Sequence, residues 1–413
     1  MKMIELTQIQ FKNYSRIHSQ RNIGQTVEFS LMNHFAKKLF LGLIDDNNNI
    51  HAASLILIKK IKNQGIEAIA PDGFLIDYSN FELVKTFTIE LKKYLNKKKV
   101  TFLITDPMFK YKIYDNKYNL IKNNQDILNN FISLNYKDIG YQDDFEKYDI
   151  IIENYNSSKD IYKHFNRNTQ KHIKEGINYG ITLRKGKKED IKVAYDIFKK
   201  KTPFNCSYYE NILSVFNTND NKFEIFLAEL NPNKYLIKSK KLYEEELIRN
   251  DKIHEKCNQN IGKITEKLFN KKMDSDNRLQ KLHENLKKAI DINSLYKENL
   301  VIGTSLIIKN NREIYFLIDG FKDKYRSIHS THILKWAIIK KYFKMGYRIF
   351  NLGEIHKNFK DIDNKYHNQY LDKIGFGGNI IEYPPNLLLV INKKRYIYYS
   401  KIKNSKILNH LIK

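Results

Sequence analysis

Apolar residues in the first part of the chain recur with two different periods. Leu39 to Leu43 and Ala52 to Ile58 are short apolar runs on either side of a polar turn, as in a pair of strands. From Phe81 to Asn96, apolar side chains return every third or fourth residue, which predicts an amphipathic helix. The short apolar run from Val100 to Ile104 predicts a buried strand. Residues 1–150 are therefore expected to form one mixed α/β unit.

A second α/β unit is predicted in two pieces, residues 151–233 and 298–413. Its main predicted elements are a basic helix from Ile161 to Tyr179, strands at Phe223 to Leu230 and Leu300 to Ile308, and a helix from Thr331 to Met345. Each of these helices is followed directly by a glycine, which is a common helix stop.

Residues 234–297, between these two pieces, follow a different pattern. They contain no proline, and their apolar residues keep a spacing of three and four with Asn250 and His254 at polar positions. The predicted contact positions are Leu236, Tyr243, Leu247, Cys257, Ile261, Ile264 and Leu268, then Leu279, Leu282, Leu286, Ala289 and Asn293. This spacing predicts an antiparallel coiled-coil hairpin inserted into the second unit.

The net charge of +26 changes the picture from a plain α/β protein to one suited to polyanions. Nucleic acid, a nucleotide-linked substrate and an anionic membrane surface are all compatible with such a field. A genome bias toward lysine, combined with a need for solubility, would produce the same excess. The charge therefore favours a class of partner without choosing one.

Cysteine content and hydropathy point to a cytoplasmic location. Cys206 and Cys257 form no disulfide framework, which fits a reducing compartment. The N-terminus has no signal-peptide pattern, and no apolar run approaches the roughly 18 residues of a membrane span. Peripheral contact with the inner face of the membrane stays open.

The sequence suggests neither a metal nor a cofactor. The 12 histidines are scattered, and the spaced pairs His164–His172 and His329–His332 lack acidic or cysteine partners nearby in the sequence. Residues 375–378 are glycine-rich but are not followed by the Lys-Ser/Thr of a phosphate-binding loop. We therefore expect no metal site and no cofactor.

One lysine stands out by its position. Lys373 lies two residues before a Gly-Phe-Gly-Gly turn that leads into a β-branched segment. A cation held by such a turn could stabilise a developing oxyanion. A turn lysine that simply faces solvent is the competing interpretation.

Several short patterns occur in a fixed order around this turn. They are Ala70-Pro-Asp-Gly-Phe-Leu-Ile-Asp-Tyr78, Asp106-Pro107, Asn166-Arg-Asn-Thr-Gln-Lys-His-Ile-Lys174, Trp336-Ala-Ile-Ile339 and Gly346-Tyr-Arg-Ile-Phe-Asn-Leu-Gly353. Together with the inserted hairpin, this ordered set resembles the Fem family, the FemA/FemX/MurM-type aminoacyltransferases of peptidoglycan interpeptide bridges. The resemblance covers nearly the whole chain.

The resemblance implies both a fold and a reaction. The fold would be two GNAT-like subdomains, the second interrupted by the helical arm. The reaction would transfer an amino acid from aminoacyl-tRNA to the stem peptide, or to the growing bridge, of a peptidoglycan precursor. The acceptor would be lipid II or its UDP-linked nucleotide form, and the chemistry would be aminolysis of an ester.

The resemblance also implies catalytic residues. Lys373 matches the family lysine that would contact phosphate or the oxyanion, although Asp372 replaces the usual phenylalanine. Asp106 matches the family Asp-Pro and would orient or deprotonate the incoming amine. A simple turn before Pro107 explains Asp106 equally well.

Further residues are implied as substrate contacts: Lys37, Lys38, Phe40, Tyr208, Tyr209, Phe316 and Tyr325. An arginine expected near the tyrosine pair is absent, with Phe204 or Asn205 in its place, and a lipid-linked acceptor would accommodate this loss.

A basic helix supplies the candidate tRNA contacts Lys163, Arg167, Lys171 and Lys174. The lysines of the hairpin form a second candidate surface, although interleaved acidic residues make an ordinary solvated coiled coil the simpler interpretation.

Two other functions remain open on the sequence. A GNAT enzyme that uses acyl-coenzyme A is one, although the usual pyrophosphate loop is not apparent. A non-enzymatic RNA-binding protein is the other, although no RNA-binding module is apparent.

Overall fold

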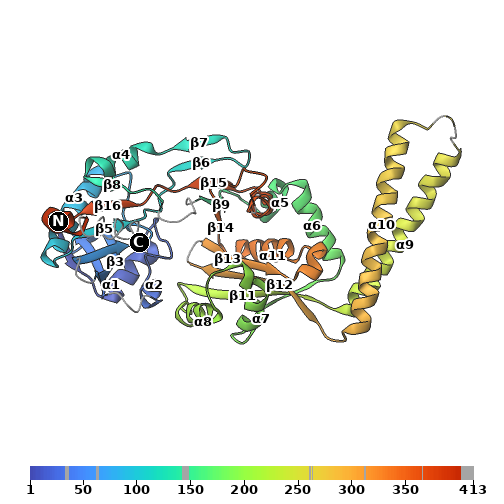
Figure 1. Ribbon diagram of the computed structural model, residues 1–413, viewed down its shortest axis with the longest axis horizontal. Coiled ribbons are helices and arrows are strands. Elements are labelled where there is room, and N and C mark those ends of the chain that lie inside the picture. The colour runs from blue at the N-terminus through green and yellow to red at the C-terminus, as the bar shows by residue number, and fades with distance from the viewer. Residues whose placement is uncertain are drawn as a thin grey trace, which may run out of the picture.

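The computed structural model describes residues 1–32, 37–61, 65–141, 148–259, 262, 264–310, 313–364 and 366–400. It contains two mixed α/β units built on two separate sheets, with a long helical hairpin projecting from the second (Figure 1). The predicted fold class is confirmed. Within these described ranges, no helix is both long enough and apolar enough to cross a bilayer.

The first sheet has seven strands in the order β1-β2-β3-β4-β5-β16-β8. Their bounds are β1 Lys2–Glu5, β2 Lys37–Ile44, β3 Ile50–Ile61, β4 Gly65–Ala70, β5 Phe102–Thr105, β16 Leu387–Val390 and β8 Tyr136–Asp138. The helices of this unit are α1 Gln8–Ile17, α2 Val27–Met32, α3 Phe81–Lys97 and α4 Gln125–Ser133. The sequence had predicted β2, β3, α3 and β5 closely.

Helix α3 shows why that prediction succeeded. Asn80 caps its first turn by accepting a hydrogen bond from the Leu83 N–H at 3.1 Å. Val84, Phe87 and Leu91 lie on one face and are buried against the first sheet. Burial on a single stripe is what the three-to-four spacing demands.

The second sheet has nine strands in the order β10-β11-β12-β13-β14-β9-β15-β6-β7. Their bounds are β10 Thr182–Lys185, β11 Lys222–Leu230, β12 Leu300–Lys309, β13 Glu313–Phe321, β14 Ile349–Ile355, β9 Tyr148–Ile152, β15 Asn379–Glu382, β6 Lys112–Tyr114 and β7 Leu120–Asn123. Its helices are α5 Ser158–His164, α6 Arg167–Asn178, α7 Asp190–Phe198, α8 Cys206–Val215, α11 Ser330–Lys344 and α12 His367–Ile374, with 3-10 turns η1 Lys199–Lys201 and η2 Asp323–Ile328.

The two sheets exchange strands, so the chain does not divide cleanly near residue 150. Strands β6 and β7 come from the first part of the sequence but pair within the second sheet. Conversely, β16 comes from the last part and lies between β5 and β8 of the first sheet. Sequence periodicity finds a strand but does not name its partner, and this exchange was therefore not foreseen.

The predicted basic helix from Ile161 to Tyr179 is two helices, so that prediction was wrong. Helix α5 ends at His164, and α6 begins at Arg167. Between them, the Asn166 side chain accepts a hydrogen bond from the Thr169 N–H at 2.7 Å and caps α6. Asparagine is among the strongest N-cap residues, and its local hydrogen bond favours a new helix start over continuation.

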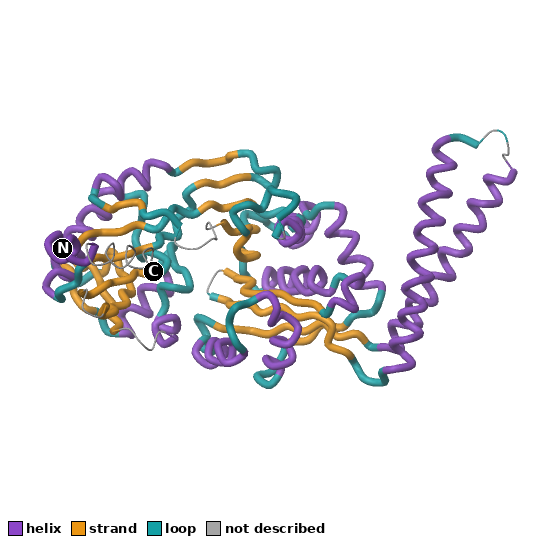
Figure 2. Tube along the Cα trace, viewed as in Figure 1, coloured by secondary structure: helices purple, strands orange, loops and turns teal. Residues whose placement is uncertain are grey.

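The insertion consists of α9 Pro232–Gln259 and α10 Glu266–Leu295, which pack against each other as an antiparallel pair (Figure 2). Its contact face is the predicted one along α10, where Leu279, Leu282 and Leu286 are partly buried and Ala289 is buried, but only in part along α9. The buried residues of α9 are Pro232, Tyr235, Ser239, Glu246, Asn250, Ile253 and Cys257, whereas Leu247 is 36% exposed. Ile261 lies outside the described residues.

Polar residues determine that face. Asn250 donates to the Asp276 carboxylate at 2.7 Å and to the Ser275 hydroxyl at 3.2 Å. Glu246 is 4% exposed and meets Arg278 at 3.1 Å. Buried polar pairs of this kind fix the register of a helical pair.

Candidate active site

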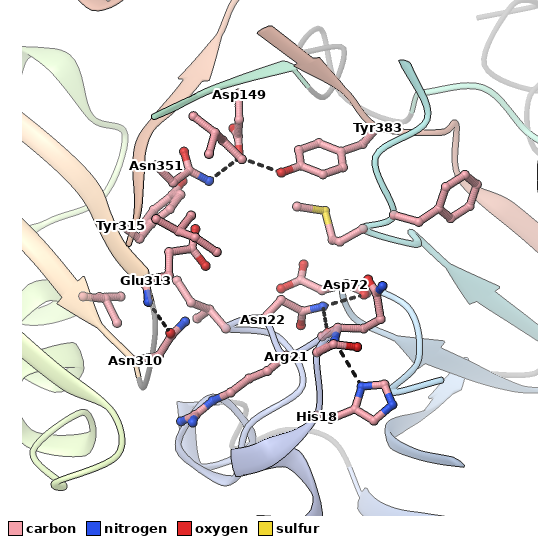
Figure 3. A pocket seen from close by; sticks show the side chains of 18 of the residues that line it. His18, Arg21, Asn22, Asp72, Asp149, Asn310, Glu313, Tyr315, Asn351 and Tyr383 are labelled. Carbon is pink, nitrogen blue, oxygen red and sulfur yellow. Dashed lines mark hydrogen bonds between the residues drawn. The ribbon is translucent and has the colours of Figure 1, made fainter. Parts of the chain in front are cut away.

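A cavity of about 660 Å³ lies between the two units. Side chains from opposite walls line it: Asp72, Asn22, Arg21 and His18 from the first unit, and Asp149, Asn351, Glu313, Tyr315 and Tyr383 on the other side (Figure 3). A concave site that collects polar side chains from several elements is the usual form of a substrate pocket.

Asp149, on β9, is the centre of the second-unit wall. Its carboxylate accepts hydrogen bonds from the Asn351 amide at 2.6 Å and from the Tyr383 hydroxyl at 3.2 Å. The residue is 3% exposed. Asn351 also accepts a hydrogen bond from the Gly353 N–H at 2.8 Å, which continues the network along β14.

Glu313, the first residue of β13, faces this group. Burial and the nearby Asp149 carboxylate raise the pKa of Glu313 to about 7. Its backbone N–H donates to the Asn310 side chain at 3.0 Å, which anchors the start of the strand. A carboxyl group that titrates near neutrality can accept a proton from a substrate amine.

Lys373 lies where β13 and β14 separate. These parallel strands pair only from Glu313–Ile349 to Tyr315–Asn351, and β14 then bulges before Glu354. Lys373 is half-buried, and its Nζ donates to the Glu354 backbone carbonyl at 2.6 Å. Burial, followed by the neighbouring Lys335, lowers the pKa of Lys373 to about 8.

Gly353 connects Lys373 with the cavity wall. Its φ of +81° suits glycine, and a Cβ placed there would lie 3.4 Å from Lys373 Nζ and 4.0 Å from the Tyr315 hydroxyl. The ammonium group and the cavity-lining tyrosine therefore flank the same glycine. The bare backbone at this position leaves room for both.

A second lysine beside Lys373 is already paired. Lys335 is 7% exposed and bonds the Asp319 carboxylate, which also accepts a hydrogen bond from Ser305 at 2.6 Å. Burial alone would raise the pKa of Asp319, but the Lys335 ammonium outweighs it and the net shift is downward. This buried ion pair therefore lies beside Lys373 without lining the cavity.

Asp106 supports the opposite wall. Its carboxylate accepts a hydrogen bond from the Asp72 N–H at 2.8 Å, and Asp72 in turn accepts one from the Gly24 N–H at 2.6 Å. Asp72 adopts φ +56°, a strained conformation that these bonds hold in place. Asp106 is not among the residues that line the cavity, whereas Asp72 is.

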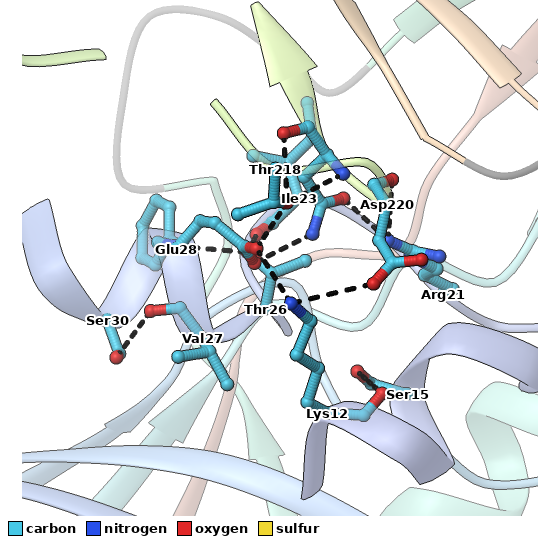
Figure 4. Close-up of polar contacts among 12 residues, drawn as sticks. Lys12, Ser15, Arg21, Ile23, Thr26, Val27, Glu28, Ser30, Thr218 and Asp220 are labelled. Carbon is cyan, nitrogen blue, oxygen red and sulfur yellow. Dashed lines mark hydrogen bonds and ion pairs between the residues drawn. The ribbon is translucent and has the colours of Figure 1, made fainter. Parts of the chain in front are cut away.

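Polar contacts join the two units around Arg21, which also lines the cavity (Figure 4). Glu28 on α2 is 3% exposed and accepts hydrogen bonds from Asn221 at 2.7 Å and Thr218 at 2.8 Å. Arg21 donates to the Asn221 side chain at 2.6 Å and to the Asp220 carbonyl at 3.0 Å. The loop before β11 is thereby tied to the first unit.

The expected substrate contacts are dispersed. Tyr208 lines the cavity and stacks on Phe204, with ring centroids 4.1 Å apart. Lys37 and Lys38 begin β2 and do not line the cavity, and Phe40 is buried against Phe11.

Three further candidates are core residues. Tyr209, Phe316 and Tyr325 are 3%, 2% and 5% exposed. Tyr209 nevertheless keeps a polar contact, since its hydroxyl donates to Thr202 at 2.8 Å. Their burial assigns these side chains to packing.

The four expected tRNA contacts lie on two helices instead of one. Lys163 is on α5, and Arg167, Lys171 and Lys174 are on α6, and all four are exposed.

Glu313 and Asp149 were not among the candidate site residues predicted from the sequence. The alternation of β13 offered one signal, because Glu313, Tyr315 and Leu317 share the face that lines the cavity while Phe316 faces the core. Asp149 lies in an apolar strand, and nothing local marks it. The cavity brings together residues that are far apart in the sequence.

Comparison with known proteins agrees with this architecture. Aminoacyltransferase FemB of Staphylococcus epidermidis is 24% identical over 420 residues, covering 97% of this chain and 98% of that protein. Aminoacyltransferase FemA of the same species is 24% identical over 386 residues, covering 89% and 90%. The crystal structure of FemX matches with a TM-score of 0.72 at 17% identity, covering 96% of this chain and 99% of FemX. A family model described as the FemAB family matches residues 6–404, and the chain belongs to that family.

Proposed function

We propose that this protein is an aminoacyltransferase that moves an amino acid from aminoacyl-tRNA onto a peptidoglycan precursor. Membership of the FemAB family and the names of the FemA and FemB relatives support the reaction class. The observation that carries the proposal is the position of the half-buried Lys373 beside Gly353 and the cavity-lining Tyr315, on the wall that also carries Glu313, a carboxyl group of raised pKa. Perturbed titration of several groups in one cleft is characteristic of active sites.

The proposed reaction is aminolysis of an ester. The neutral amine of the precursor attacks the ester carbonyl carbon of the aminoacyl-tRNA and forms a C–N bond. The tetrahedral intermediate carries an oxyanion, and its collapse breaks the C–O bond to the tRNA ribose. One proton leaves the amine, and the ribose oxygen gains one. The protein must stabilise the oxyanion, hold both substrates and manage the proton.

Lys373 is the proposed oxyanion partner. With a pKa of about 8, its ammonium group is still mostly protonated at pH 7. The hydrogen bond to the Glu354 carbonyl holds the amine beside the separating strands. A positioned cation of this kind needs no rearrangement when negative charge develops.

Glu313 is the proposed proton acceptor. It lines the cavity, and its pKa of about 7 balances the unprotonated fraction against basicity at neutral pH. We assign Asp106 a positioning role instead, because its carboxylate holds the Asp72 turn. Lipid II and the UDP-linked precursor both remain candidate acceptors.

The test combines purified protein, a charged tRNA pool and each precursor separately, with mass spectrometry of the products. The proposal predicts that one precursor gains the mass of one amino acid and that ribonuclease abolishes the gain. Absence of transfer with every aminoacyl-tRNA and both precursors, from a folded protein, would refute it. A parallel reaction contains acetyl-coenzyme A in place of the charged tRNA. Product formation in that reaction would favour the acyl-coenzyme A alternative.

Mass spectrometry of stem peptides from cells with and without the gene identifies the donor amino acid independently. A defined mass difference of one residue would name the amino acid.

A further inference from the structure

Three histidines that are distant in the sequence meet beside the Lys373 turn. His172 lies on α6, while His329 and His332 lie at the start of α11. One ring nitrogen of each can be chosen so that all three atoms lie within 4.8 Å of one another. We propose that His172, His329 and His332 form a binding site for a divalent transition metal of the zinc type, which links α6 to α11.

The spacing of the nitrogen atoms suits such an ion. A tetrahedral zinc with nitrogen ligands at about 2.1 Å places those atoms about 3.4 Å apart. Nδ1 of His172 and Nε2 of His332 are already 3.5 Å apart. The His172 and His329 rings are stacked, with centroids 3.7 Å apart and planes 9° from parallel. Because imidazole lone pairs lie in the ring plane, the His329 side chain must rotate for all three nitrogens to face one ion.

The helices beneath these rings are held close together. A Cβ on Gly176 would lie 2.0 Å from the Ile333 side chain and 2.9 Å from the Ile328 carbonyl, so only glycine permits this contact. The ligands would therefore come from two elements with a fixed separation. A site on rigid elements holds its geometry better than one on loops.

Glu175 offers a fourth ligand. Its Oε2 is 3.8 Å from His329 Nε2, and Glu175 lies one helical turn after His172. Lys171 and Lys335 also lie near the rings, and Lys335 is neutralised by Asp319.

The metal site would affect the turn that holds Lys373 in place. The His332 ring lies against Phe376, with ring centroids 5.6 Å apart, and the Asn166 N–H at the start of α6 donates to the Gly375 carbonyl at 2.8 Å. Both contacts reach the turn that follows Lys373. A metal that fixes α6 to α11 would stiffen that turn without touching the substrates.

The test uses untagged full-length protein, because a polyhistidine tag would bind the probe. After chelator treatment and dialysis, the protein is titrated with zinc chloride in a calorimeter and with cobalt chloride in a spectrophotometer. We expect one zinc per chain, a Kd of micromolar or tighter, an intense visible cobalt spectrum typical of four-coordination, and a higher Tm with zinc.

The variants are His172→Gln, His332→Gln and His329→Asn, since asparagine tolerates the φ of +54° at position 329. Each should weaken zinc binding at least 100-fold and abolish the Tm shift. His164→Gln, an exposed histidine at the end of α5, is the matched control and should bind as the wild type does.

Each variant is first compared with metal-free wild type by circular dichroism. If buried His332→Gln fails to fold, half-buried His172→Gln carries the test. No saturable zinc binding, or equal affinity in wild type and His172→Gln, would overturn the proposal.

Discussion

The helical hairpin and the cavity wall each contain a glutamate shielded from solvent, but the neighbouring charges are opposite in sign. In the hairpin, Glu246 lies between two arginines and accepts a hydrogen bond from Ser275. In the cavity, Glu313 faces the carboxylate of Asp149, and its pKa rises to about 7. A neutralised buried charge supports a structure, whereas a carboxyl group placed next to another carboxylate retains a proton that chemistry can use.

The largest effect should come from replacing Lys373, the proposed oxyanion partner. Lys373→Ala should lower the transfer rate about 100- to 1,000-fold, the usual loss for one oxyanion-stabilising donor. Lys373→Arg keeps the charge and should retain part of the activity. Steady-state transfer assays measure both. Lys344→Ala, an exposed lysine at the end of α11, should change nothing. Unchanged transfer in Lys373→Ala would make this residue an ordinary turn lysine.

Glu313→Gln should lower transfer about 100-fold, a typical contribution of a general base. The wild-type rate should rise with pH through about 7 as Glu313 loses its proton, and this step should vanish in the variant. Rate profiles from pH 5.5 to 8.5 measure it. Glu153→Gln, which removes a cavity carboxylate paired with Lys110, should leave the midpoint in place. If Glu153→Gln also removed the step near pH 7, the step could not be assigned to Glu313.

Glu313 should also leave a mark on stability. Its pKa is about 4.5 when unfolded and about 7 when folded, so the folded protein binds more protons between these values. The free energy of unfolding should therefore fall as pH rises from about 4.5 to about 7, and level off above. Glu313→Gln should remove this decline and be the more stable protein at pH 8. Denaturant unfolding curves at pH 5 and pH 8, for wild type and variant, measure the sign of this change in the free energy of unfolding.

In the hairpin, Glu246→Ala should cost about 1–2 kcal/mol of local stability. The loss is moderate because Arg249 and Arg278, which remain behind, have side chains 52% and 58% exposed. Hydrogen exchange along α9 and α10 should accelerate while exchange in the two sheets stays constant. Acceleration throughout the chain would show that the hairpin is not an independent unit of opening.

The smallest effects should come from single exposed cations. Replacing Lys163, Arg167, Lys171 or Lys174 by alanine should weaken tRNA binding only a few-fold each and lower the salt slope by less than one. Lys271→Ala on α10 is the corresponding change on the hairpin. Fluorescence anisotropy at several salt concentrations compares the two surfaces. An effect confined to Lys271 would move the proposed tRNA surface from α5 and α6 to the hairpin.

Local patterns explain which parts of the fold were predictable. Helix α3 and strands β2 and β3 each carry their own periodicity and capping residues, and they were predicted near their observed bounds. The break between α5 and α6 was missed, because the Asn166 cap opposes a helical pattern that continues on both sides. A strong local hydrogen bond can override periodicity.

The site depended on information that no local pattern contains. Lys373 was identified by its turn, but Glu313, Asp149 and Tyr383 come together only through strand pairing. Neighbouring residues of a strand face opposite sides of the sheet, so Phe316, a predicted substrate contact, is buried in the core, whereas Tyr315 beside it lines the cavity. The histidine group is similar, because His172 acquires its partners only when α6 packs on α11.

The exchanged strand β16 has a consequence for how the chain is made. It lies between β5 and the edge strand β8, so β8 cannot join the other strands of the first sheet until residues 387–390 have left the ribosome. The first sheet is therefore completed only after the chain has been synthesised past α12 of the second unit. We expect the two units that form the cavity walls to fold in one cooperative step. Long chains more commonly fold domain by domain.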